Sequence, residues 1–161
     1  MSEFENTDFS RDSLPFNLVG LGGTFDHLHK GHKKLLKVAF TTGKKVAIAL
    51  TTEKLLNSKE HGEKLESYQI REKNLRNYIE KSLNISKEHY SIIPLEDPFG
   101  PAITEEDLEA HISSEESYKM AFKINEKRRE KGLDPFILII IPYVRDESGE
   151  RYSSTKIREN L

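Results

Sequence analysis

The stretch that decides the fold is LVGLGGTFDHLHKGH, which runs from Leu18 to His32 and is followed by the helical pattern KKLLKVAF at residues 33–40. An apolar strand leads into a glycine-bearing turn and then into a helix. This order brings backbone N–H groups and the positive end of a helix dipole to one point, an arrangement that binds phosphate. We therefore expect an anion site that includes Gly22, Gly23 and Gly31.

The histidines of this stretch indicate what the anion site does. His29 and His32 lie three residues apart, so they share one face of the helix if it has begun by that point. With the Thr24 hydroxyl they indicate chemistry on a phosphate. A competing interpretation makes His27, His29 and His32 ligands of a zinc ion, with Asp26 as a further ligand. The glycine turn favours phosphate over metal, and His27 is then a bystander.

Strands and helices alternate along the rest of the chain. Candidate strands cover residues 17–22, 45–51, 90–95, 110–113 and 136–143, and candidate helices cover 31–42, 67–83, 115–131 and a short segment after Ser154. The alternation predicts a doubly wound, Rossmann-like α/β fold: a five-stranded parallel sheet with helices on both faces. We expect a single domain over residues 17–161 after a polar, loosely held tail at 1–16. The last strand is apolar on both faces, which is typical of a strand covered by helices on each side.

The composition narrows the class of protein. The 161 residues carry a formal net charge of −2 and include no cysteine, so disulfides and thiolate chemistry are excluded. The small net charge gives no support for binding to nucleic acid or to a membrane surface. No apolar run is long enough to span a bilayer, and the first sixteen residues do not resemble a signal peptide. We expect a cytoplasmic protein. The sequence does not determine the oligomeric state, and a monomer is slightly favoured.

A second motif lies near the end of the chain, where Ser153, Ser154 and Thr155 precede Arg158. Taken alone, these hydroxyls are ordinary helix N-cap residues. With the distant histidine motif, they indicate a second phosphate site, in which Arg158 adds positive charge.

Together the two motifs, His-Lys-Gly-His at 29–32 and Ser-Ser-Thr-Lys-Ile-Arg at 153–158, resemble the signatures of the nucleotidyltransferase superfamily. The segments between them, DPFGP at 97–101, SEES at 114–117 and INEKR at 124–128, resemble the archaeal and eukaryotic type of phosphopantetheine adenylyltransferase. The resemblance covers residues 17–161. It implies adenylyl transfer from ATP to 4′-phosphopantetheine, with dephospho-coenzyme A and pyrophosphate as products. It also implies Mg²⁺ bound with ATP, and ATP, 4′-phosphopantetheine and dephospho-coenzyme A or coenzyme A as ligands.

The resemblance also assigns roles to residues. His32 and His29 would contact the α-phosphate, Thr24 would orient the acceptor phosphate, and Lys59, rather than Lys54, would approach the phosphates of both substrates. The nucleotide site would comprise the following residues: Gly22, Gly23, Phe25, Gly31, Ser153, Ser154, Thr155 and Arg158. Asn125 and Arg128, three apart on one helix, would bind substrate. We expect no dedicated protein cage for a metal.

Three alternatives stay open at this point. A sibling enzyme, either a cytidylyltransferase or a nicotinamide-mononucleotide adenylyltransferase, would share both motifs, although Arg151-Tyr152-Ser153-Ser154 lacks the Arg-Thr-x-Gly-Ile-Ser run usual in cytidylyltransferases. A metal-dependent hydrolase would use the histidine cluster. A catalytically silent nucleotide-binding module would use neither motif for chemistry. The chain has no Gly-x-x-x-x-Gly-Lys-Ser/Thr motif, so it lacks the P-loop of the kinase that completes coenzyme A.

Overall fold

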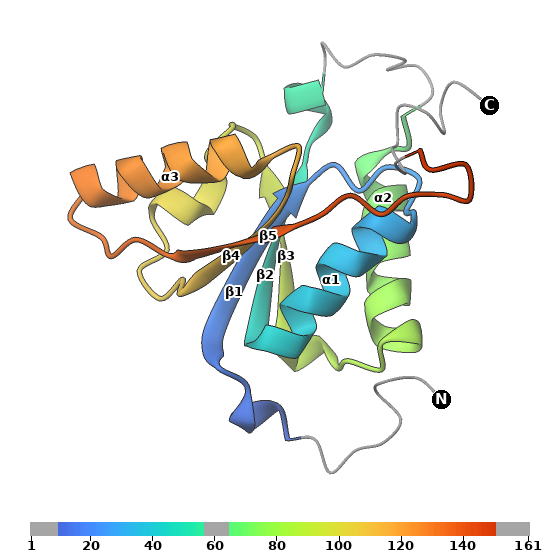
Figure 1. Ribbon diagram of the computed structural model, residues 1–161, viewed down its shortest axis with the longest axis horizontal. Coiled ribbons are helices and arrows are strands. Elements are labelled where there is room, and N and C mark those ends of the chain that lie inside the picture. Colours follow the sequence, from blue (N-terminus) through green and yellow to red (C-terminus); the bar gives the residue numbers. More distant parts are fainter. Residues whose placement is uncertain (1–9, 57–64, 151–161) are drawn as a thin grey trace.

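The computed structural model describes residues 10–56 and 65–150 (Figure 1). Its centre is one sheet of parallel strands in the order β3-β2-β1-β4-β5. The strands are β1 (Phe16–Gly23), β2 (Gly43–Thr51), β3 (Tyr90–Leu95), β4 (Ala110–Ser114) and β5 (Ile137–Ile141). The strand order reverses between β1 and β4, and ligands bind at such switch points in open α/β sheets. The predicted doubly wound, five-stranded fold is confirmed.

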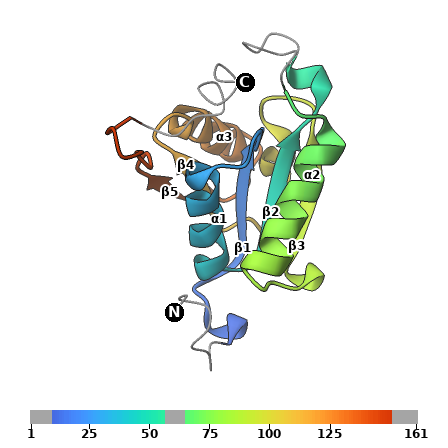
Figure 2. The same ribbon diagram turned by 90° about the vertical axis from the view of Figure 1, so that its right-hand side faces the viewer.

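Helices cover both faces of this sheet. They are α1 (Lys30–Thr42), α2 (Tyr68–Asn77) and α3 (Tyr118–Glu130), and α2 continues as a π-helical turn at Tyr78–Ser82. Figure 2 shows α1 and α2 side by side on one face, with α3 on the opposite face. Crossover connections between parallel strands are right-handed. The chain moves toward one edge of the sheet from β1 to β3 and toward the opposite edge from β4 to β5, so the connecting helices lie on opposite faces.

The helix boundaries have local causes. The Ser67 side chain accepts a hydrogen bond from the backbone N–H of Ile70 and so caps the start of α2. At the end of α3, Gly132 has φ of +79°, a left-handed conformation that glycine adopts without strain. The predicted C-cap role of Gly132 is confirmed. None of the described helices is long and apolar enough to cross a membrane.

Each face of the sheet has its own apolar cluster. Under α1 and α2, the described residues form a cluster of seventeen buried side chains that includes Val19, Leu36 and Leu75. Under α3, the cluster has four buried members: Leu108, Ala121, Ile124 and Phe136. The difference follows from alternation along the strands, because Val19 and Leu21 of β1 point to the first face whereas its small residues Gly20 and Gly22 point to the second.

One expectation needs correction. The last strand was expected to be buried on both faces, but among the described strands β5 lies at the edge of the sheet beside β4, and Ile137 and Ile140 are 57% and 42% exposed.

The structure describes the predicted tail from Ser10 onward. Arg11 donates hydrogen bonds to the carbonyl oxygens of Phe40 at 3.0 Å and Gly43 at 2.7 Å, so this part of the tail is held against the end of α1.

Candidate active site at the start of α1

The first turn of α1 is closed by its own two histidines. His29 is the N-cap residue, and its Nδ1 accepts a hydrogen bond from the backbone N–H of Gly31 at 3.0 Å. In return, His32 Nδ1 accepts from the backbone N–H of His29 at 3.3 Å. The two rings stack with centroids 3.7 Å apart. The predicted pairing of His29 and His32 on one face of the helix is confirmed.

This capping arrangement determines which ring nitrogen carries the proton. A neutral imidazole has one donor and one acceptor nitrogen, so accepting at Nδ1 places the hydrogen on Nε2 in both rings. Burial lowers the pKa of His29 to about 4, and its ring is therefore neutral at pH 7. The start of α1 thus carries two Nε2–H donors beside the positive end of the helix dipole, which suits a phosphate oxygen.

The loop between β1 and α1 is held in an unusual backbone conformation. Phe25 and His27 both have positive φ, at 50° and 47°. Buried Asp26 accepts a hydrogen bond from the backbone N–H of Glu66, and Glu66 Oε1 accepts from the backbone N–H of His27 at 2.7 Å. Arg71, fully buried on α2, donates to the carbonyl oxygens of Thr24 and Thr51 at 2.9 and 2.8 Å. These contacts tie the loop to the segments that follow β2.

Phe25, which the sequence predicts in the nucleotide site, has a buried side chain. It is 2% exposed and belongs to the core under α1 and α2. Its ring lies against that of His32, with centroids 5.3 Å apart. Phe25 therefore supports His32 from within the core.

The competing zinc interpretation lacks its ligand set. Among the described residues, only Asp26, His27 and Glu66 bring ligand atoms within 4.8 Å of one another. His27 lies beside Asp26, at 3.5 Å between Nε2 and Oδ2, whereas His29 and His32 stack on each other. The three histidines do not form a metal group in the described part of the chain.

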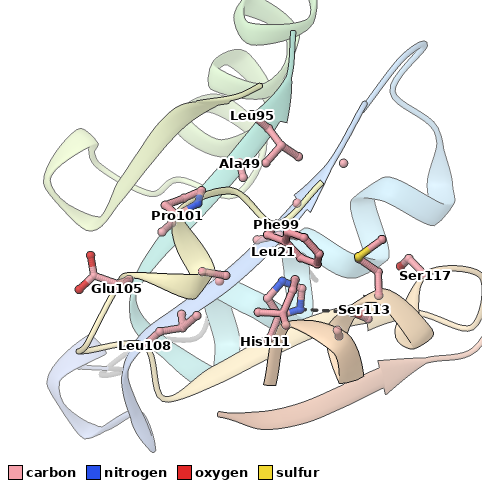
Figure 3. Close-up of a pocket in the computed structure, with 18 of the residues that line it drawn as sticks. Leu21, Ala49, Leu95, Phe99, Pro101, Glu105, Leu108, His111, Ser113 and Ser117 are labelled. Atoms are coloured by element: carbon pink, nitrogen blue, oxygen red, sulfur yellow. Dashed lines mark hydrogen bonds between the residues drawn. The ribbon is translucent and has the colours of Figure 1, made fainter. Parts of the chain in front are cut away.

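An apolar cavity of about 190 Å³ lies on the opposite, α3-facing side of β1 (Figure 3). It reaches Gly22 and Gly23, the last residues of β1 before the histidine loop. Its other walls come from β2, β3, β4, the segment 98–108 and the first turns of α3. Apolar side chains such as Leu95, Phe99 and Leu108 form most of its surface. The predicted glycine turn at Gly22 and Gly23 is instead the end of β1, and it adjoins a pocket suited to an apolar chain.

Asn125 and Arg128, which the sequence predicts to bind substrate, both make hydrogen bonds to the backbone. Asn125 makes a pair of hydrogen bonds with the backbone N–H and carbonyl of Phe136. Arg128 is fully buried and donates to the carbonyl oxygens of Ala102 and Glu105, each at 2.7 Å. The polar atoms of both side chains bind backbone groups, and these hydrogen bonds hold the cavity wall in place.

Several predicted site residues lie outside the described ranges. These are Lys59, Ser153, Ser154, Thr155 and Arg158. Thr24, Gly22, Gly23, Gly31, His29 and His32 are described, and they gather at the carboxyl end of β1 and the start of α1.

The sequence analysis missed two features of the site. The bracing role of Glu66 has no local signal, because its partners lie about forty residues earlier. His111 and Ser113, which line the cavity from β4, do have a signal. They occupy alternate positions of β4, and Ala110 and Ile112 at the positions between and before them belong to the apolar core, so His111 and Ser113 share the opposite face.

Comparison with known proteins agrees with this geometry. The model of the cytidylyltransferase-like family matches residues 21–160. A phosphopantetheine adenylyltransferase from Pyrococcus abyssi is 39% identical over 148 residues, which cover 92% of this chain and 92% of the relative. One from Methanosarcina mazei is 43% identical, over 86% of this chain and 88% of the relative. The chain belongs to the phosphopantetheine adenylyltransferase family.

Solved structures support the same fold. A protein of unknown function from Archaeoglobus fulgidus is 31% identical, with a TM-score of 0.67, and the match covers 76% of this chain and 87% of that one. A bifunctional nicotinamide-mononucleotide adenylyltransferase from Francisella tularensis has a TM-score of 0.62 at 16% identity, over 90% of this chain and 41% of that one. The second match shows that the sheet and its helices are shared.

Proposed function

We propose that the chain transfers the adenylyl group of ATP to 4′-phosphopantetheine and releases pyrophosphate, forming dephospho-coenzyme A. One observation carries the proposal: the stacked His29 and His32 follow, through a short loop, the strand end Gly22–Gly23 that lines an apolar cavity. The histidine end suits phosphates, and the cavity suits the arm of the acceptor. The relatives named phosphopantetheine adenylyltransferase, at 36–43% identity, support the choice of substrates.

The reaction exchanges one phosphoanhydride bond for another. A phosphate oxygen of the acceptor bonds to the α-phosphorus of ATP, and the bond from that phosphorus to the bridging oxygen of the β-phosphate breaks. The attacking oxygen is already ionised near pH 7, so no general base is required. Catalysis then depends on alignment and on donors placed where charge develops.

In this proposal, the Nε2–H groups of His29 and His32 donate to the phosphate chain at the start of α1. The Thr24 hydroxyl orients the acceptor phosphate. Arg71 is a positioning residue, because it holds the carbonyl of Thr24. Lys59, Ser153, Ser154, Thr155 and Arg158 would bind the outer phosphates.

We expect Mg²⁺ to accompany ATP and to offset the charge of the triphosphate. Asp26 Oδ1 and Glu66 Oε1, the carboxylate oxygens nearest the loop, already accept backbone N–H groups. This donor set does not offer a cage of uncommitted oxygens, so phosphate oxygens and water are the expected ligands of the ion.

The test is a pyrophosphate-release assay that offers ATP or CTP against 4′-phosphopantetheine, nicotinamide mononucleotide and phosphocholine. We expect release only with ATP and 4′-phosphopantetheine in the presence of Mg²⁺. The reverse reaction should form ATP from dephospho-coenzyme A and pyrophosphate, and no coenzyme A should accumulate. Faster release with CTP, or with nicotinamide mononucleotide, would identify a sibling transferase instead.

A further inference from the structure

The cavity beside the histidine loop is apolar with one deep polar feature. Its polar lining side chains are Glu105, His111, Ser113 and Ser117. Ser117 is exposed and bonds within its own turn, to Ser114. Glu105 is also exposed, and its Oε1 accepts from the backbone N–H of Asp107. His111 and Ser113 are therefore the polar groups deep in the cavity.

His111 is held rigidly in this position. Its Nδ1 lies 3.2 Å from the Ser113 hydroxyl (Figure 3). Its ring stacks on that of Phe136 with centroids 5.1 Å apart. The neighbouring position on β1 is Gly20, and a side chain there would meet Leu108 at 2.9 Å and His111 at 3.7 Å. The lack of a side chain at Gly20 leaves room beside the imidazole.

One ring nitrogen of His111 remains for a ligand. Among the described residues, its only hydrogen bond runs from Nδ1 to Ser113, so Nε2 has no partner there. A ligand that fills the cavity and covers this nitrogen without supplying a hydrogen-bond partner pays a free-energy cost, so a ligand that offers a partner binds more tightly. Burial lowers the pKa of this ring to about 4, so at neutral pH it presents no charge.

We propose that His111, oriented by Ser113, is a specificity-determining residue that hydrogen-bonds a neutral amide in the arm of the acceptor. This inference rests on the proposed function, in which the acceptor arm lies in the cavity. The pantetheine arm is an apolar chain interrupted by two amide groups, and each amide needs a partner when it enters an apolar cavity. A neutral imidazole can serve as donor or acceptor, according to its tautomer.

The experiment compares two ligands by isothermal calorimetry: 4′-phosphopantetheine, and a phosphorylated alkyl chain of equal length without amides. His111→Phe keeps the ring and removes both nitrogens. We expect it to weaken 4′-phosphopantetheine binding about tenfold, as for one lost hydrogen bond, and to leave the amide-free ligand within twofold of the wild type. His111→Gln should recover part of the loss. His89→Phe, at the amino end of the sheet, is the matched control and should change neither ligand.

Equal weakening of both ligands by His111→Phe, or no weakening of either, would overturn the inference. The variants are first compared by thermal unfolding, and His111→Gln provides the reading if the phenylalanine variant does not fold. The experiment can distinguish a failure of this inference from a failure of the proposed function. Amide-dependent binding without adenylyl transfer would refute the proposed function but support the role of His111. Adenylyl transfer without amide-dependent binding would support the proposed function but refute the role of His111. A wild-type protein that binds neither ligand would refute both.

Discussion

The two faces of the sheet differ in how completely they are packed. The face under α1 and α2 is filled, with seventeen buried apolar residues among those described, and the face under α3 has four and a cavity. Each face also buries one arginine that binds backbone carbonyls: Arg71 holds the histidine loop, and Arg128 holds the cavity wall. The filled face gives the first turn of α1 a rigid base, and the hollow face leaves space for an acceptor.

The largest effect is expected in the first turn of α1, which packs on the filled face. In the proposed mechanism, the Nε2–H group of His32 stabilises charge on the transferred phosphate, so we expect His32→Ala to lower turnover about 100-fold or more. Steady-state kinetics with 4′-phosphopantetheine and ATP measure this loss, and circular dichroism should show an unchanged fold. His27→Ala is the control and should cost little, because His27 lies beside Asp26 and away from the stacked pair. A fully active His32→Ala enzyme would refute the assignment of the site.

The two buried arginines should fail in different ways. Arg71→Met and Arg128→Met each leave buried carbonyls without donors, and each should lower the free energy of unfolding by roughly 2–3 kcal/mol. Urea denaturation measures this. Only Arg71→Met should also lower kcat, because it releases the Thr24 carbonyl, whereas Arg128→Met should mainly raise the KM for the acceptor. If both variants showed the same change in kcat and KM, the two faces of the sheet would not have separate roles in catalysis and acceptor binding.

Glycine substitutions compare the packing of the faces directly. A side chain at Gly43, against the filled face, would meet Val19 Cγ2 at 2.6 Å and Cβ at 2.8 Å. At Gly22, beside the cavity, the nearest atoms belong to Ala49 at an ordinary 3.5 Å. We expect Gly43→Ala to destabilise by about 1–2 kcal/mol, as overpacking does, and Gly22→Ala by less than about 0.5 kcal/mol. Thermal unfolding checks both, and equal Tm losses would contradict the difference in packing.

The cavity face also affects the pH dependence of stability, through His111. Burial lowers the pKa of His111 to about 4, so between pH 6.5 and 4 the unfolded chain takes up a proton that the folded chain does not. The contribution of neutral His111 to the free energy of unfolding is therefore fully present above about pH 6.5, and it decreases as the pH falls toward 4. His111→Phe removes this contribution, and its free energy of unfolding should fall less steeply over that range. Urea denaturation at a series of pH values would refute the prediction if the two curves ran parallel.

The sequence predicts the phosphate half of the site well because its signals are local. The predicted strand, the glycine pair and the two histidines lie together in residues 17–32, and the mutual capping of His29 and His32 at the start of α1 brings the two rings together. For Asn125 and Arg128, helical spacing predicts a shared face of α3 but not what that face contacts. Both side chains contact backbone contributed by residues 102–108 and 136.

The cavity half is harder to predict because its form depends on contacts between distant segments. The apolar run 137–141 is the same whether it lies inside the sheet or at its edge, and only the strand order places β5 at the edge. His111 and Ser113 can be found by alternation within β4, yet nothing in that strand shows that an open space faces them. That space exists because Gly20 and Gly22, on a strand almost ninety residues earlier, have no side chains.

The position of these cavity residues also bears on how acceptor choice can evolve. Gly20, Gly22, His111 and Ser113 occupy every second place on two strands at the centre of the sheet, not places in a loop. A lineage that changes its acceptor can do so by single substitutions at these alternate positions, without an insertion or deletion. Chain length, strand register and the histidine motif would all be inherited unchanged, so descendants with different acceptors would still share the same phosphate chemistry.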